Sequence, residues 1–353
     1  MYTRCTIQLA ADKVGPRRPQ TRPPSHALHC MMTDLRERLE TRQVSIYFIA
    51  ICAAVVCALS MPNTGMLEQA INPALAFMLF VTFLQVPMSE LGQAFTKLRF
   101  LAALLCANFV VIPLVVAVLV QFLPEDPMVR LGVIFVLLTP CIDYVVTFSH
   151  LGRADAKLLL AATPALLALQ MLLLPAYLTL FLGEASADLV RLGPFFDAFV
   201  WLIAVPLVLA ALFQVWAARS AAGERFSVRL GLLPVPATAL VLFVVVAAVM
   251  PQLGVAIGTA ARVIPVYIAF AVAAPVAGWL VARAFGLHAP AGRAVAFSAA
   301  TRNSLVVLPL ALAVPGAIPI LPAIIVAQTI VELVSELIYI RVIPKLGCER
   351  QSG

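Results

Sequence analysis

Three short stretches of this apolar chain carry polar side chains of the kind that bind ligands. The first, LLTPCIDYVVTFSH at residues 137–150, contains Pro140, Cys141 and Asp143. A proline inside a helix removes one hydrogen bond and clashes with the preceding turn. Backbone groups beside a thiol and a carboxylate would then be free to contact a ligand. The stretch therefore predicts an interrupted helix with a binding site at the break.

The second stretch, ATRNSLV at residues 300–306, holds Thr301, Arg302 and Asn303 inside another apolar run. A charge at the centre of a bilayer costs about 2.5–3.5 kcal/mol on insertion scales, so charges within membrane segments are candidates for function. We expect Arg302 and Asp143 to approach each other, because pairing offsets part of that cost. A purely structural ion pair that joins the two breaks is the plainer alternative.

The third stretch, IVELVSELIY at residues 330–339, places Glu332 and Glu336 on one face of a helix. Glu332 is the deeper of the two, and we expect it to bind and release a proton during transport. Glu336 lies within about one turn of Arg341 and the end of the run. We expect Glu336 only to pair or to reach solvent there.

The composition of the chain indicates a membrane protein. Hydrophobic residues make up 63% of its 353 residues and charged residues 12%, about half the charged share of soluble domains. A helix needs about 20 apolar residues to cross a bilayer core, and a transmembrane barrel would alternate apolar and polar residues. The fold class is therefore an all-α polytopic membrane protein. Its ten predicted spans are 44–61, 71–88, 98–122, 128–150, 156–183, 196–217, 228–250, 262–285, 291–314 and 318–340.

The basic residues predict how the chain is oriented. Of the 24 Lys and Arg, twenty fall on one side of the predicted membrane and three on the other, while Arg302 lies within a span. Cytoplasmic loops carry the excess of Lys and Arg. Both termini are thus predicted to be cytoplasmic, in a multi-pass protein of the plasma or inner membrane. This distribution accounts for the net charge of +7 without a nucleic-acid partner.

A single transporter domain, residues 44–343, is expected between two tails. Residues 1–43 are rich in proline and arginine and are predicted to form a disordered, basic cytoplasmic tail, with a short charged helix at 33–43 leading into the first span. Residues 344–353 form the C-terminal cytoplasmic tail. The seven cysteines include no CxxC pair, so neither a disulfide framework nor a zinc site is expected. No cofactor is expected.

The ten spans divide into two halves of five, 44–183 and 196–343. A repeat with an odd number of spans inserts upside down relative to its twin, which is the plan of many secondary transporters. The polar stretches then occupy the fourth span of each half. We predict two inverted five-helix repeats whose broken fourth and ninth helices cross at mid-membrane. The GxxxxGK[ST] signature is absent, and neither an enzyme nor an ATP-driven pump is expected.

The two breaks also carry a resemblance to a known family. PCIDYVVTFSHLGRAD resembles the fourth-span signature of arsenite efflux transporters in the bile acid/arsenite/riboflavin transporter superfamily. AFSAATRNSLVVLPLALAV is similar to the ninth span of that family, and IVELVSELIY to the tenth. The resemblance covers about residues 44–343 and implies a required cysteine at Cys141 and a functional glutamate at Glu332. The fourth-span matches are Pro140, Cys141, Ser149, Leu151, Arg153 and Asp155.

Two positions depart from the pattern of that family. Arg302 replaces the first asparagine of a ninth-span pair, of which only Asn303 is kept, and Asp143 stands where a small or apolar residue is usual. Sodium–bile acid symporters are more distant, because the glutamate and glutamine that serve sodium there fall on Ser298 and Arg302. Sodium needs hard oxygen ligands, and Arg302 would repel it. Sodium coupling is therefore not expected.

The resemblance and the residues together predict efflux of arsenite, and of Sb(III) as a related substrate, in exchange for protons by alternating access. Trivalent arsenic is soft and prefers thiolate. Cys141 alone would hold the metalloid reversibly, whereas three thiolates would trap it. Glu332 and Asp143 are the predicted proton-coupling residues. The predicted substrate-binding residues are Cys141, Thr301, Arg302, Asn303 and Asp143, with the helix break at Pro140.

Two other functions stay open. In an organic-anion carrier, Arg302 and the positive N-termini of the half-helices would hold a carboxylate of a bile-acid-like or keto acid. A membrane sensor without transport would show no flux, and the short cytoplasmic loops argue against it. The sequence predicts a small inorganic or small-molecule substrate and a lipid environment, and it leaves the oligomeric state open.

Overall fold

The computed structural model describes residues 24–61, 64–85, 97–142, 144–183, 197, 200–250, 253–312, 314, 316–317 and 319–347. The regular elements of this part of the chain are helices. They are α2 (Pro24–Ser60), η1 (Thr64–Leu67), α3 (Glu68–Phe83), α5 (Leu98–Cys106), η2 (Ala107–Val111), α6 (Ile112–Val120), α7 (Pro127–Leu137), α8 (Val145–Leu151), α9 (Ala156–Leu182), η4 (Val200–Ala204), α11 (Val205–Arg219), α12 (Ala221–Leu230), α13 (Pro234–Val249), α14 (Leu253–Ala284), α15 (Ala289–Ala300), α16 (Ser304–Leu312), α17 (Ile320–Val342) and η6 (Ile343–Lys345).

Each of the ten predicted spans overlaps a helix or a broken pair of helices. The bent pair α12 and α13, with 47° between its helices, is a further candidate span. The fourth and ninth predicted spans are divided into α7 and α8 and into α15 and α16. The chain is thus a multi-pass helical membrane protein. Within the described residues, six helices are long and apolar enough to cross a bilayer: Leu35–Ser60, Thr64–Phe83, Leu98–Phe122, Ala165–Leu182, Ala256–Ala284 and Ile320–Lys345.

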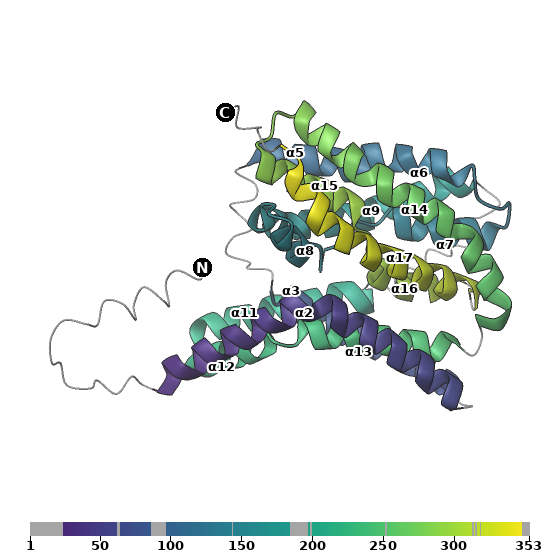
Figure 1. Ribbon diagram of the computed structural model, residues 1–353. Coiled ribbons are helices and arrows are strands. Elements are labelled where there is room, and N and C mark those ends of the chain that lie inside the picture. The colour runs from purple at the N-terminus through teal and green to yellow at the C-terminus, as the bar shows by residue number, and fades with distance from the viewer. Residues whose placement is uncertain are drawn as a thin grey trace, which may run out of the picture.

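The helices form two layers (Figure 1). The first layer contains α2, α3, α11, α12 and α13, and in it α13 packs against both α2 and α3. The second layer contains α5 to α9 and α14 to α17, with α17 packed between α14 and α7. The layers touch where α16 meets α3 and where α13 meets α17. Each half of the chain contributes its first two predicted spans to the first layer and its last three to the second.

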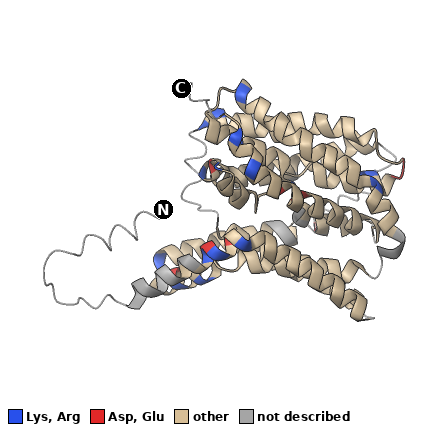
Figure 2. Cartoon of the chain, in the orientation of Figure 1, with Lys and Arg blue, Asp and Glu red and all other residues tan. Residues whose placement is uncertain are grey.

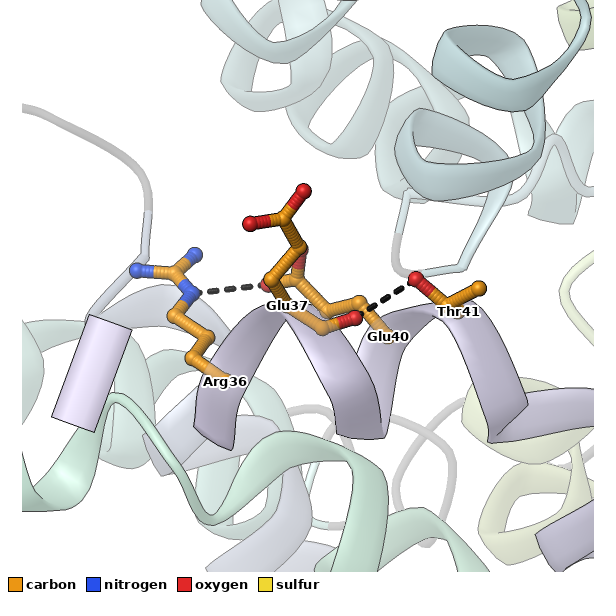
Figure 3. A network of polar contacts seen from close by, with 4 residues as sticks. All are labelled: Arg36, Glu37, Glu40 and Thr41. Atoms are coloured by element: carbon orange, nitrogen blue, oxygen red, sulfur yellow. Dashed lines mark hydrogen bonds and ion pairs between the residues drawn. The ribbon is translucent and has the colours of Figure 1, made fainter. Parts of the chain in front are cut away.

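Helix α2 joins the charged N-terminal segment to the first predicted span without a break. It begins at Pro24, inside the stretch that the sequence assigns to the tail, and it includes the short helix predicted at 33–43. Arg36 Nε donates to Glu40 Oε1 at 2.7 Å on its surface, and Thr41 Oγ1 donates to the carbonyl of Glu37 (Figure 3). Such a helical ion pair contributes only about 0.3–0.5 kcal/mol. Packing of α2 against α13 therefore holds this segment more than its charges do.

Charged side chains gather toward one end of both layers. Figure 2 shows most Lys and Arg at the left of the view, the end at which α2 begins and α17 finishes, and few charged residues across the middle. Large apolar side chains are exposed on helices of both layers, such as Leu209 on α11, Leu114 on α6 and Val272 on α14. Exposed apolar surface of this extent suits lipid rather than water.

The first helix break has a local cause. Helix α7 ends at Leu137, three residues before Pro140. Proline lacks the N–H that would continue the helix, and it pushes the residue before it out of the helical conformation. Thr139 Oγ1 lies 3.0 Å from the carbonyl oxygens of both Phe135 and Val136 and donates to this last turn. The carbonyl groups of Leu137 and Thr139, which lack partners within the helix, accept hydrogen bonds from Arg302 and Asn303 instead.

The second break, between α15 and α16, contains no proline and is held open by tertiary hydrogen bonds. Thr301 at its start has an extended backbone, with φ −97° and ψ 127°. The N–H of Arg302 donates to Glu332 Oε2 at 2.8 Å, and the N–H of Asn303 donates to the carbonyl of Thr139 at 2.8 Å. Both N–H groups would have continued the helix. Partners outside α15 satisfy them instead, which a buried backbone requires.

Candidate functional site

The two helix breaks pair with each other through their backbones. Pro140 and Arg302 form an antiparallel bridge. The N–H of Cys141 donates to the carbonyl of Thr301 at 3.0 Å, and the N–H of Asn303 donates back to the carbonyl of Thr139 at 2.8 Å. The prediction that two non-helical segments from opposite halves of the chain lie together is therefore confirmed for the described residues.

The carboxylate of Glu332 links both breaks to α17. Its Oε1 accepts from the hydroxyl of Tyr144 at 2.5 Å, just after the first break. Its Oε2 accepts from the backbone N–H of Arg302 in the second break at 2.8 Å and from Gln328 Nε2 at 2.5 Å. The side chain is 3% exposed. Three donors therefore converge on one buried acidic group, so any change in its charge or position acts on both breaks at once.

Two further contacts extend this network along α17. The hydroxyl of Ser304, at the start of α16, donates to the amide oxygen of Gln328. One turn beyond Glu332, the hydroxyl of Thr301 lies 2.5 Å from Glu336 Oε1 and donates to it. Helix α17 thus reaches both ends of the second break with polar side chains on one face.

The expectation for Glu336 is wrong. The sequence predicted that this carboxyl group pairs with Arg341 or reaches solvent at the end of its helix. In the structure its side chain is 0% exposed and faces Thr301. Its Oε2 has no hydrogen-bond partner among the described residues. Distance along the sequence from the end of the run does not give depth, because the Glu336 side chain points inward from α17 toward the break.

Arg302 is fully buried, with 0% exposure. Within the described part of the chain the one ion pair is Arg36–Glu40, so neutral oxygen atoms surround the Arg302 guanidinium there. Its Cζ lies 5.5 Å from the centre of the Phe270 ring. The four described acceptors are Asn108 Oδ1 at 2.9 Å, Ser298 O at 2.6 Å, Ala299 O at 2.6 Å and Leu137 O at 3.3 Å.

Asn108 faces Arg302 because the helix widens at this residue. It lies in η2, a π-helical turn directly before Pro113, and such turns often mark functional sites. Its Nδ2 donates to the carbonyl of Leu104 and to Ser298 Oγ, each at 3.0 Å. These two bonds leave the amide oxygen of Asn108 to accept from the guanidinium.

The remaining predicted site residues have different outcomes. Cys141 is 0% exposed, Asn303 is 1% exposed, and both lie in the paired breaks. Asp143 lies outside the described residues, so its pairing with Arg302 stays a prediction. Arg302 Nε has no acceptor among the described residues, so the guanidinium retains one donor for such a contact.

Two cavities flank the tyrosine–glutamate pair. One lies between the layers and encloses about 340 Å³, including its open side, and Tyr144 lines it together with Gln43, Thr147 and Thr238. The other lies within the second layer, encloses about 230 Å³, and has Glu332 in its lining. Cys141 lines neither of these two cavities. Tyr144 is thus the side chain that touches both the space between the layers and the buried carboxylate.

Three residues of this network were missed from the sequence: Asn108, Tyr144 and Gln328. Each is a polar side chain within a predicted span, and each therefore carries the same signal that identified Thr301 and Asn303. Asn108 is a single polar residue in an apolar run, and Gln328 stands one helical turn before Glu332. Tyr144 follows the first break directly, and a buried tyrosine hydroxyl needs a hydrogen-bond partner.

Comparison with known proteins identifies the family to which this chain is similar. Residues 72–258, more than half of the chain, match the family described as Sodium Bile acid symporter family. The matched segment runs from α3 into α14, so it contains the first break and ends before the second. No curated protein matched the chain.

Proposed function

Because the chain belongs to the sodium bile acid symporter family, we propose that it is a secondary transporter that exports arsenite in exchange for protons. Its transport site is the pair of helix breaks. The observation that carries this proposal is the position of Glu332, which is bonded to Tyr144 after one break and to the backbone of Arg302 in the other. Interrupted helices in matching positions of two halves are typical of sites for substrate and coupling ion.

The ten spans form two inverted repeats in this proposal. The layer arrangement supports it, since each half gives two spans to one layer and three to the other (Figure 1). Relative motion of the layers would expose the breaks alternately to the two sides of the membrane. The basic loops orient both termini toward the cytoplasm.

Tyr144 gives Glu332 a way to exchange a proton without losing its contacts. The tyrosine hydroxyl donates to Glu332 Oε1 at 2.5 Å and has a second acceptor, the carbonyl of Arg302, at 3.4 Å. When Oε1 takes up a proton, it can donate to the tyrosine oxygen, and the tyrosine proton then turns toward the carbonyl. Each state keeps its donors and acceptors matched, as buried polar groups require.

The lining of the cavity between the layers supports a small neutral substrate. It offers hydroxyl groups from Tyr47, Thr82 and Thr238 and amide groups from Gln43 and Gln85, and Glu40 is its one charged residue among those described. Arsenous acid is a small neutral molecule with three hydroxyl groups. Glu40 lies on the charged segment of α2, which we place on the cytoplasmic side, so the cavity would admit substrate for export.

Cys141 supplies the soft ligand in this proposal. Its thiol belongs to the first break, and its backbone bonds the second. Because it is buried between them, the thiol reaches substrate only when the breaks separate from their neighbours during the transport cycle. One thiolate holds trivalent arsenic weakly enough to release it. Thr301 and Asn303 would contribute polar contacts beside it.

The structure gives less support to an organic-anion carrier. Such a carrier needs a cation that faces the substrate, but the Arg302 guanidinium is bonded to four oxygen atoms inside the second layer. Among the described residues that line the cavity between the layers, none is basic. A carboxylate would meet Glu40 there instead.

Arsenite flux in everted membrane vesicles tests the proposal. Vesicles that contain the wild-type protein should accumulate arsenite when a pH gradient is imposed, and the Glu332→Gln variant should not. Excess antimonite should compete, whereas a bile-acid-like carboxylate should not. Saturable uptake of the carboxylate with no arsenite flux would replace this proposal with the organic-anion carrier. Absence of both fluxes in well-inserted protein would favour the membrane sensor.

A further inference from the structure

We infer that Arg302 is a resident cation: its side chain fills a site for a monovalent cation built by the C-terminal ends of α7 and α15. Leu137 is the last residue of α7, and Ser298 and Ala299 lie in the last turn of α15. Their carbonyl oxygens bond the guanidinium at 3.3, 2.6 and 2.6 Å. The final carbonyl groups of a helix lack partners in the helix and carry its negative pole.

The break in α15 creates this site. In a continuous helix the carbonyl of Ser298 would accept from the N–H of Arg302, and the carbonyl of Ala299 from the N–H of Asn303. Those N–H groups bond Glu332 and Thr139 instead. The two carbonyl oxygens therefore face an apolar interior without backbone partners, and a positive charge satisfies both at once.

The other groups around the guanidinium suit a cation of single charge. Asn108 turns its amide oxygen inward because its Nδ2 is bonded to Leu104 and Ser298. The Phe270 ring lies 5.5 Å from the guanidinium carbon, a distance at which an aromatic ring attracts a cation. Within the described residues no carboxylate lies within ion-pair distance of Arg302. Neutral oxygen ligands and one ring match a monovalent ion or a guanidinium better than a divalent metal.

A tethered cation prevents a free ion from occupying the same site during transport. A site of this kind at paired helix breaks would otherwise bind a free ion in each cycle. Because Arg302 never leaves, the wild-type site offers no place for an external cation, and transport cannot draw energy from sodium there. This consequence rests on the proposed transport function. The binding site itself does not, and its test requires no substrate.

The test is the thermal stability of purified Arg302→Ala protein in different chloride salts. Choline is too large for the vacated site, whereas guanidinium at low millimolar concentration should fill it. We expect guanidinium to raise the Tm of Arg302→Ala by at least about 2 °C over choline, with sodium giving a smaller rise. The wild-type protein should show no such difference. The control is Arg99→Ala, which also loses an arginine bonded to a carbonyl, that of Phe285, but at an exposed position.

Two further variants keep the test decisive if Arg302→Ala protein does not fold without added cation. Arg302→Lys keeps a tethered charge and should fold in choline. Arg302→Met keeps bulk without charge, and because its side chain occupies the site, it should be less stable than the wild type in every salt. Arg302→Ala and Arg302→Met proteins as stable as the wild type in choline, and unaffected by guanidinium, would overturn the inference. Failure of all three variants in every salt would also overturn it, because the shape of arginine rather than its charge would then be required.

Discussion

The carboxylate of Glu332 accepts hydrogen bonds from three segments of the chain. Its donors are Tyr144 beyond the first break, the backbone of Arg302 in the second and Gln328 one turn earlier on α17. A hydrogen bond to a charged group contributes about 1.5–3 kcal/mol. Loss of one donor therefore makes the charged form of Glu332 less stable and frees its side chain to move. Glu332 is the group that we expect to carry the proton.

Replacement of Tyr144 by phenylalanine tests this contact. We expect Tyr144→Phe to insert normally and to slow proton-driven arsenite flux at least about tenfold, because one hydrogen bond of that strength is lost. Tyr177→Phe is the matched control, since that hydroxyl bonds a backbone carbonyl, that of Phe109, and not Glu332. Equal flux in the two variants, measured in vesicles with equal protein content, would remove Tyr144 from the coupling mechanism.

Replacement of Cys141 by serine tests the soft ligand. Cys141→Ser should abolish arsenite resistance in cells while the protein still reaches the membrane, because a hydroxyl binds trivalent arsenic far less well than a thiolate. Serine replacements of Cys52, Cys57 and Cys106, which are exposed or partly exposed rather than buried, should leave resistance intact. Full resistance in Cys141→Ser cells would exclude a thiol mechanism.

The residues of the site were predictable to different degrees. Pro140, Cys141, Thr301, Arg302, Asn303 and Glu332 were identifiable because proline, thiol or charge is costly or unusual inside an apolar run. Asn108, Tyr144 and Gln328 carry the same signal of a polar side chain within a predicted span, but their roles as partners were not predictable. Which polar residues meet depends on how helices distant in the sequence pack. The inward direction of Glu336 has the same origin, since the position of a residue along a helix does not show which face it occupies.

Helices α14, α15 and α17 form the frame that holds the second break. Gly278 on α14 allows α15 to approach closely: a Cβ there would lie 2.6 Å from Ala299 Cβ and 3.0 Å from the Cα of Ala296. Ala299 belongs to the turn whose carbonyl bonds Arg302. The position of the break therefore depends on a residue that makes no polar contact with it.

A methyl group at position 278 should displace α15 and with it the second break. We expect Gly278→Ala to destabilise the protein by about 1–3 kcal/mol, as overpacking does, and to reduce transport. Gly258→Ala on the same helix is the control, because a Cβ there meets nothing within 4 Å and alanine favours a helix by about 0.5–1 kcal/mol. Thermal unfolding of both purified variants checks this. A Gly278→Ala protein as stable as Gly258→Ala would show that the approach is not tight.

The elements were easier to predict than their arrangement. All ten predicted spans overlap helices because long apolar runs leave few other structures in a membrane, and Pro140 marked the first break. The second break has no such local signal, and polar residues alone pointed to it. The continuation of α2 back to Pro24 was missed because composition suggested a disordered tail.

At the scale of the whole molecule, the basic residues gather toward the end at which α2 begins and α17 finishes (Figure 2). This asymmetry supports an orientation with that end in the cytoplasm. The polar cavity between the layers includes Glu40 and Gln43 from the charged part of α2. The structure would then represent a state that is open toward the cytoplasm.

Single cysteines in a cysteine-depleted protein test this orientation. Glu125→Cys, in the exposed loop before α7, should react with a membrane-impermeant maleimide added to intact cells. Ala222→Cys, at an exposed position of α12, should react only after the membrane is opened. The reverse pattern would invert the orientation, and labelling of both from outside would contradict the predicted number of crossings between them.

Proton movement in reconstituted proteoliposomes tests the central claim most directly. The purified protein would be inserted in the vesicle membrane, and a pH-sensitive dye would be enclosed in the interior. Arsenite would be added outside, with no pH gradient at the start. The account predicts that arsenite entry drives protons out, so the interior becomes more alkaline with the wild-type protein. Glu332→Gln and protein-free vesicles should give no such signal. Arsenite entry with no proton movement, or no arsenite entry by protein that is folded and inserted, would contradict arsenite–proton exchange at the paired helix breaks.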